Sequence, residues 1–327
     1  MVLKSKAIGG YFELELPTGN NSYYPNALKY NSARSAFYAL LLHCKPKRIW
    51  IPYYICDSML LFLKETNIQP LFYSINLDFS IKEKIDIKNS DLLLYINYFG
   101  LCSDVQNNLL KTFNQKQIIF DHSQAFFIPP KDCLATLYSP RKFFGIPDGG
   151  LLITSLPIKE PSIVDNNSIN RSIHLLKRLS GEPEDGYTHY HHSEESLNDI
   201  TPRKMSLLTE RLLSSIDYKK IKARRESNFQ YLHSQLDTIN LIKMPSELII
   251  GPMLYPFLYS RNTNKLKNEL LKERFFSATY WPECERRVHK NSTEYKMIKN
   301  MLPLPCDQRY NQGDMKRINA VLHNHLI

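Results

Sequence analysis

Leu134-Ala-Thr-Leu-Tyr-Ser-Pro-Arg-Lys-Phe-Phe-Gly-Ile-Pro-Asp-Gly-Gly-Leu-Leu-Ile-Thr154 is the stretch from which the architecture is most easily worked out. Two short apolar runs, residues 134–138 and 150–154, flank a loop that contains Lys142. Short apolar runs bounded by Pro and Gly predict buried strands. The loop is therefore expected to present Lys142 just beyond the end of a strand, and Gly149-Gly150 lets other backbone pass close to it.

Similar apolar runs alternate with helical patterns between about residues 30 and 155. The predicted helices cover residues 31–42, where a capped start is expected, and 57–65. The predicted strands cover residues 48–52, 69–74, 91–97, 117–121, 134–138 and 150–154. Near-continuous apolar strands separated by helices indicate an α/β fold with a mostly parallel sheet covered on both faces. Functional residues are expected at the strand ends.

The pattern changes after residue 155, where a polar stretch leads to a long helical region over about 205–236. An apolar run then covers 248–259, and two further helices are predicted over 265–274 and 314–325. We therefore predict a large domain over 1–240, with an N-terminal arm over about 1–28, and a small α+β domain over 241–327.

Composition and charge restrict the class of protein. The chain has 327 residues, 43% of them apolar, which suffices for one large core. It has no run near the roughly 20 apolar residues that span a bilayer and no secretory leader at its start, so a cytoplasmic protein is expected. The six cysteines form no Cys-x-x-Cys pair, which predicts free thiols.

The net charge of +10 suggests nucleic-acid binding as one interpretation. The basic residues are spread along the chain, however, and the densest group, within 218–226, fits a solvated helix face. We therefore predict no nucleic-acid partner. A positive surface also suits a phosphorylated small substrate.

Pyridoxal 5′-phosphate (PLP) requires a lysine, an acid for its pyridine nitrogen, an anion site for its phosphate and contacts to its ring. Lys142 is the candidate lysine. Asp121 ends the apolar strand over 117–121 and is the candidate acid, and Gln124 follows to hydrogen-bond the phenolic oxygen. The alternatives are a surface lysine in a turn for Lys142 and a helix cap or metal ligand for Asp121.

The candidate phosphate site is the helix start Ser32-Ala-Arg-Ser-Ala36. Free N–H groups and the helix dipole favour an anion at such a start. The predicted contacts are Ala33, Arg34 and Ser35, with Ser139 as a further hydroxyl. Taken alone, either segment is also explained as a capped helix or an ordinary turn.

In this order, four elements resemble the DegT/DnrJ/StrS family of sugar-nucleotide aminotransferases, which are fold-type-I PLP enzymes. The elements are the helix start at Ser32–Ala36, the strand end Ile51-Pro-Tyr-Tyr-Ile-Cys-Asp57, Asp121-His-Ser-Gln124, and Lys142 followed by Asp148-Gly-Gly150. The resemblance covers most of the chain and implies the PLP-dependent transferase fold.

The resemblance implies an aminotransferase that moves an amino group from an amino acid, glutamate or glutamine, to a keto-sugar nucleotide in glycan or deoxyaminosugar synthesis. Lys142 would bear the cofactor and later carry a proton between Cα and C4′. Asp121 would pair with the pyridine nitrogen and Gln124 would approach the ring oxygen. The phosphate would be held by Ala33, Arg34, Ser35 and Ser139. A homodimer with shared active sites is also implied.

The chain departs from the family pattern at several positions. Arg34 stands where a threonine is common, and the position of the ring-stacking aromatic is occupied by Cys56, with Tyr53 and Tyr54 nearby. The family's Asn-x-Arg-Met-Ser segment, which reaches the partner's site, appears as Thr201-Pro-Arg-Lys-Met-Ser206 without the asparagine. The predicted substrate contacts are Tyr98, Trp281 and Arg309; core packing and a surface ion pair are the alternatives for the last two.

Two other functions remain as alternatives. One is a PLP-dependent sugar dehydratase of the same family, in which a histidine replaces the lysine, so Lys142 favours transamination. The other is a binding or regulatory protein that keeps the fold without turnover. The group His189, His191 and His192 lacks a carboxylate spacing typical of zinc sites, and no metal is predicted.

Overall fold

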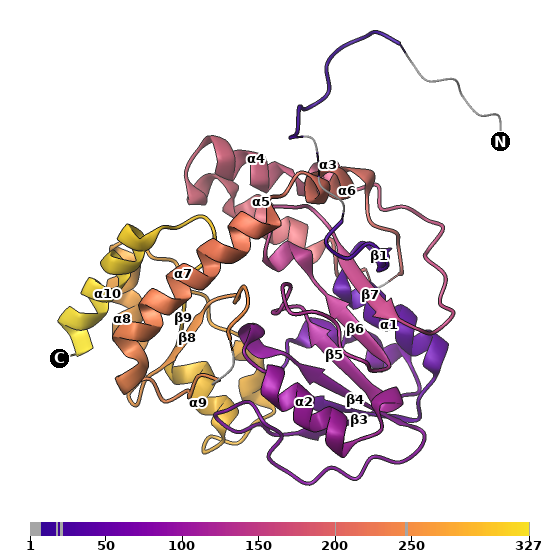
Figure 1. Cartoon of the computed structure of the whole chain (residues 1–327), viewed down its shortest axis with the longest axis horizontal. Coiled ribbons are helices and arrows are strands. Elements are labelled where there is room, and N and C mark those ends of the chain that lie inside the picture. Colours follow the sequence, from indigo (N-terminus) through magenta and orange to yellow (C-terminus); the bar gives the residue numbers. More distant parts are fainter. Residues whose placement is uncertain (1–7, 18, 20–21, 200, 246–247, 327) are drawn as a thin grey trace.

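The computed structural model describes residues 8–17, 19, 22–199, 201–245 and 248–326. Its centre is a seven-stranded sheet in the order β1-β7-β6-β5-β4-β2-β3 (Figure 1). The strands are β1 (Leu28–Tyr30), β2 (Arg48–Pro52), β3 (Gln69–Tyr73), β4 (Asp91–Ile96), β5 (Ile118–His122), β6 (Ala135–Tyr138) and β7 (Gly150–Thr154). Neighbours from β3 to β6 are parallel, and β7 pairs antiparallel with both β6 and β1. The predicted mostly parallel sheet is confirmed.

Helices pack on this sheet and make up much of the remaining chain. They are α1 (Ala33–Cys44), α2 (Ser103–Thr112), α3 (Ser168–Arg171), α4 (Ile173–Ser180), α5 (Pro183–Glu195), α6 (Leu207–Ser214), α7 (Tyr218–Leu236), α8 (Asn264–Lys272), α9 (Thr293–Asn300) and α10 (Gln312–Leu326). The 3-10 turns are η1 (Asp57–Met59), η2 (Leu61–Glu65), η3 (Tyr98–Gly100), η4 (Gln115–Gln117), η5 (Pro140–Lys142), η6 (Asp237–Ile239) and η7 (Pro282–Arg286).

Helix α1 forms where the apolar pattern predicted a helix, and its caps and its buried face show why. Ser32 caps it by accepting a hydrogen bond from the Ser35 N–H, and Lys45 ends it in the left-handed conformation. Its apolar face, including Phe37 and Leu40, is buried in the main core. Strand β4 is buried along its whole length, as expected for a strand covered on both faces.

The helices of the structure differ from the predicted ones in three places. The helix expected over 57–65 is two 3-10 turns, because contacts from the C-terminal part, including an ion pair of Arg287 with Asp57, hold the start of the segment. The region over 205–236 is split into α6 and α7, with Asp217 capping the second helix. Helices α3, α4 and α5 lie in the stretch for which no helix was expected.

The C-terminal part builds a second, smaller sheet from β8 (Tyr255–Leu258) and β9 (Met301–Leu304), which pair antiparallel. Helix α7 contacts both β8 and α10 (Figure 1). The domain boundary at residue 240 remains a prediction. The N-terminal trace over residues 8–17 extends away from the body, and Tyr11 and Phe12 are exposed (Figure 1).

Two predictions from composition can be checked over the described ranges. All six cysteines are free thiols there, as predicted. Among the same residues, no helix is long and apolar enough to cross a membrane. The first seven residues, where a secretory leader was not expected, lie outside the described residues.

Candidate active site

The candidate site lies where the carboxyl ends of β6, β5 and β4 meet. In register, Asp121 of β5 lies beside Leu137 of β6 on one side and Ile96 of β4 on the other. The η5 turn with Lys142 follows β6 directly. Because β7 runs antiparallel to β6, its first residue, Gly150, returns to the same edge. The topology therefore brings the predicted lysine and acid to one edge of the sheet.

The start of α1 joins this edge through a close backbone approach. The Gly149 N–H donates to the Asn31 carbonyl at 2.7 Å. A Cβ on Gly150 would lie 2.0 Å from the Ser32 carbonyl carbon and 2.3 Å from the Ala33 nitrogen. Only glycine allows this approach, so the Asp148-Gly-Gly150 element holds the helix start against the lysine loop.

Lys142 is exposed, whereas the residues that follow it are anchored. Its N–H donates to the Ser139 carbonyl at 3.1 Å. Phe143 and Phe144 are buried in a second apolar cluster, and the Arg225 guanidinium carbon lies 4.6 Å from the Phe143 ring centre. The turn therefore presents the lysine side chain outward from a fixed base.

Asp121 and Gln124 are both buried at this edge. One Asp121 carboxylate oxygen accepts from the Ser123 N–H at 2.7 Å. The Gln124 Oε1 accepts from the Phe99 N–H at 3.1 Å, while its Nε2 has no acceptor among the described residues. Buried amide N–H groups are nearly always paired, so this donor is available to a bound molecule.

A buried side-chain network behind Asp121 was not expected from the sequence. The Asn97 Nδ2 donates to Gln106 Oε1 at 2.8 Å, and the Gln106 amide nitrogen lies 2.8 Å from His122 Nε2. Burial lowers the pKa of His122 to about 3, which keeps its ring neutral. His122 Nε2 is therefore the acceptor. The signal in the sequence was Asn97 at the end of an otherwise apolar strand.

The predicted phosphate residues begin α1. The Ser32 Oγ accepts from the Ser35 N–H at 3.1 Å and lies 2.9 Å from the Ser35 hydroxyl. The Arg34 side chain turns to Asn198, to which its Nη1 donates at 2.7 Å. Ser139 is buried just before the lysine turn. Ala33 and Ser35 therefore lie at the helix start, as predicted for phosphate contacts, whereas the Arg34 side chain points toward the end of α5.

The other predicted residues are more dispersed. Tyr54, Tyr98 and Trp281 form one aromatic cluster, but all three are buried in the core. Cys56 is half-buried. Arg309 is exposed and forms a two-pronged ion pair with Asp307 at 2.8 Å. Their roles in binding remain predictions, and the arrangement of Trp281 and Arg309 is that of the core-packing and ion-pair alternatives.

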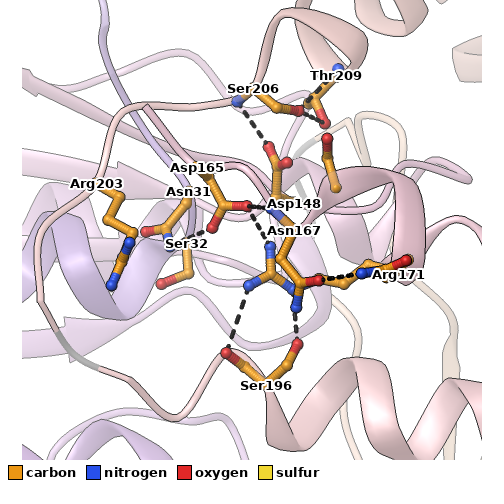
Figure 2. Close-up of polar contacts among 12 residues, drawn as sticks. Asn31, Ser32, Asp148, Asp165, Asn167, Arg171, Ser196, Arg203, Ser206 and Thr209 are labelled. Atoms are coloured by element: carbon orange, nitrogen blue, oxygen red, sulfur yellow. Dashed lines mark hydrogen bonds and ion pairs between the residues drawn. The ribbon is translucent and has the colours of Figure 1, made fainter. Parts of the chain in front are cut away.

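A buried polar network lies beside the start of α1 (Figure 2). Asp165 accepts from Arg171 at 2.7 Å and from the Asn31 amide at 3.0 Å, and Arg171 also donates to the Ser196 hydroxyl at 2.7 Å. A cavity of about 430 Å³ adjoins this network. A larger one, about 820 Å³, lies beside α2 and contains none of the predicted site residues.

Asp148 belongs to the same region (Figure 2). It accepts from the Ser206 N–H at 3.2 Å, while its other oxygen is buried without a partner within the described part of the chain. Burial raises the pKa of Asp148, although the neighbouring polar groups of Ser206 and Thr209 act in the opposite direction. Within the part of the chain that the structure describes, no group of three or more His, Cys, Asp or Glu side chains is placed to hold a metal ion.

No protein-family model matches the chain, and no curated protein matches it. Solved structures share the fold. A DegT DnrJ EryC1 StrS aminotransferase from Brucella abortus has a TM-score of 0.61 at 14% identity, over 91% of this chain and 85% of that chain. The putative sugar aminotransferase Spr1654 from Streptococcus pneumoniae has a TM-score of 0.63 at 17% identity, over 91% and 85%.

A third similar structure is the E coli GDP-4-keto-6-deoxy-D-mannose-3-dehydratase with bound hydrated PLP. Its TM-score is 0.62 at 15% identity, over 90% of this chain and 87% of that chain. At these identities the similarity establishes the fold, and the expected fold-type-I architecture is confirmed.

Proposed function

We propose that this chain, which has the fold of the DegT/DnrJ/EryC1/StrS-type sugar aminotransferases, is a PLP-dependent aminotransferase. It moves an amino group from an amino acid, glutamate or glutamine, to a keto-sugar nucleotide. The observation that supports this most is the meeting of Lys142, Asp121 and the start of α1 at one sheet edge. Lys142 also favours transamination over dehydration, because the resembling dehydratases carry a histidine at its place.

The residues at this edge fit PLP. The Gln124 Nε2 is a buried donor without an acceptor in the described chain, as the phenolic oxygen requires. Asp121 offers a buried carboxylate for the pyridine nitrogen. The start of α1, held against Gly150, offers N–H groups and the Ser35 hydroxyl to the phosphate, with Ser139 nearby in the chain.

When bound, PLP supplies an electron sink for bond breaking at the amino acid's α-carbon. The Lys142 amine would take the proton from that carbon and pass it to C4′ of the cofactor, and it would move a proton in the opposite direction in the second half-reaction. Asp121 holds a proton on the pyridine nitrogen, and Gln124 orients the ring through its oxygen. Asn97, Gln106 and His122 hold the ends of β4 and β5 in place behind Asp121.

The proposal includes a cytoplasmic homodimer whose active sites are shared between subunits. The proposed function involves no nucleic-acid partner. Sugar-nucleotide substrate and amino-acid donor use the same site in turn, as in other two-step transaminations.

Absorbance of the PLP-loaded protein tests the function. We expect the cofactor band to change with at least one amino donor, glutamate or glutamine being the first to try, and to be restored by one member of a keto-sugar nucleotide panel. A protein that binds PLP but shows no spectral change with any donor would instead support the non-catalytic alternative.

A further inference from the structure

The end of α5 gathers two arginines beside Lys142. Arg141, the residue before the lysine, forms an ion pair with Glu194 in the last turn of α5. Arg34, from the start of α1, donates to Asn198 at 2.7 Å, four residues further along the same segment. Two guanidinium groups from separate elements thus converge on residues 194–198. Carbonyl groups at the end of a helix favour such cations.

Burial and charge set this group apart from a surface ion pair. The Arg141 side chain is only 12% exposed and its Nε has no partner among the described residues, whereas the Glu194 side chain is 40% exposed. Burial alone would raise the pKa of Glu194. The positive charges of Arg141, Arg34 and Lys142 outweigh burial, so the pKa of Glu194 lies below its ordinary value. Arg141 therefore pairs directly with a carboxylate that is partly exposed to solvent, and Arg34 and Lys142 add positive charge to its surroundings.

We propose that Arg34 and Arg141 form a carboxylate-binding subsite beside Lys142, that Glu194 occupies it in the free protein, and that a carboxylate of a dicarboxylic amino donor displaces Glu194. This inference rests on the proposed aminotransferase function. A guanidinium binds a carboxylate through two parallel hydrogen bonds, and Glu194 is itself a carboxylate held by Arg141.

Displacement is feasible because Glu194 is the more exposed partner of the pair and can be solvated once it leaves Arg141. Arg141, by contrast, is mostly buried and would lose its partner if nothing replaced Glu194. A ligand carboxylate therefore supplies what the guanidinium needs, while the freed Glu194 is solvated. The donor would lie next to Lys142, whose amine acts on its α-carbon.

Titration calorimetry with glutarate tests the subsite. Glutarate has two carboxylates and no amino group, so it reports binding without reaction, and it is titrated into the full-length protein with and without PLP. We expect Glu194→Gln to bind glutarate about tenfold more tightly than the unmodified protein, since the competing carboxylate is gone. The gain should vanish in the double variant Glu194→Gln, Arg141→Gln.

Glu195→Gln is the matched control, because Glu195 is the exposed neighbour of Glu194, and it should leave the glutarate affinity unchanged. Thermal unfolding of each variant shows whether it is folded. An unchanged affinity in folded Glu194→Gln overturns the proposal, and so does a gain for inorganic phosphate without one for glutarate. Borohydride trapping of PLP on the same preparations tests the proposed function separately, because a glutarate gain does not depend on it.

Discussion

Asp121 is the residue whose charge matters most to the proposed chemistry. Asp121→Asn removes the acid that keeps the pyridine nitrogen protonated, and a lost charge-assisted hydrogen bond corresponds to about a 10- to 100-fold slower half-reaction. Cofactor capture by Lys142 should persist. Stopped-flow absorbance with an amino donor measures this rate. Asp132→Asn, an exposed aspartate, is the control, and a half-reaction equally fast in Asp121→Asn would contradict the assignment.

For single residues, the sequence predicted the position in the fold best where a residue directly follows a strand. The placement of Lys142, Asp121 and Gln124 at one edge of the sheet was predictable because each comes just after an apolar run. The partners Glu194 and Asn198 were not, because they come from a segment more than 50 residues away from Lys142 whose helices were not predicted. The Asn97–Gln106–His122 network depends on α2 lying beside β5, a long-range contact that no local pattern encodes.

Gly150 fixes how α1 meets the lysine loop, at the scale of elements. Gly150→Ala should cost about 3 kcal/mol or more of folding free energy, because its Cβ would lie 2.0 Å from backbone that cannot move aside. Urea denaturation measures the loss. Gly145→Ala is the control, since its Cβ would meet only a leucine methyl at 3.7 Å. Equal stability of the two variants would refute the close approach.

Asp165 joins Arg171 of α3 to Asn31, two residues before α1. Asp165→Asn should cost about 3–5 kcal/mol, because it leaves Arg171 buried without its counterion. Asp199→Asn breaks an exposed ion pair with Arg203 and should cost no more than about 1 kcal/mol. Chemical denaturation compares them, and similar losses would show that the buried network contributes little.

The same pair predicts a pH dependence. Burial raises the pKa of Asp165, but hydrogen bonds from Arg171, Asn31 and the Asn167 N–H outweigh it, so the pKa lies below its ordinary 3.8. The stabilisation is therefore complete above 3.8 and is lost as pH falls through the lower pKa of the folded protein. Unfolding measured from pH 7 downward should show a steeper loss in the unmodified protein than in Asp165→Asn.

The helix pair α4–α5 shows where pattern reasoning stopped. Pro183 at the first turn and the reciprocal capping of Glu182 and Asp185 specify the start of α5, yet the segment lacks a buried apolar stripe. Its close packing depends on Gly186, where a Cβ would lie 2.9 Å from the His174 carbonyl. The strands and α1 were predictable because their apolar faces are buried in this one chain.

An exposed apolar stripe runs along α3 and α4 at the scale of the whole molecule. Ile169, Ile173 and Leu176 recur at helical spacing and point outward, with Leu179 beside them. The proposed homodimer would cover this stripe. Sedimentation should give twice the 38.3 kDa chain mass, and Leu176→Glu should shift the protein toward monomer, with Lys177→Glu as control. A monomeric unmodified protein would contradict the shared-site proposal.

The central claim is that Lys142 carries PLP. Full-length protein loaded with PLP, reduced with borohydride and digested should yield one modified peptide, containing Lys142. The Lys142→Ala variant should incorporate none, while Lys131→Ala should incorporate as much as the unmodified protein. Label at another lysine, or equal labelling of Lys142→Ala, would contradict the account.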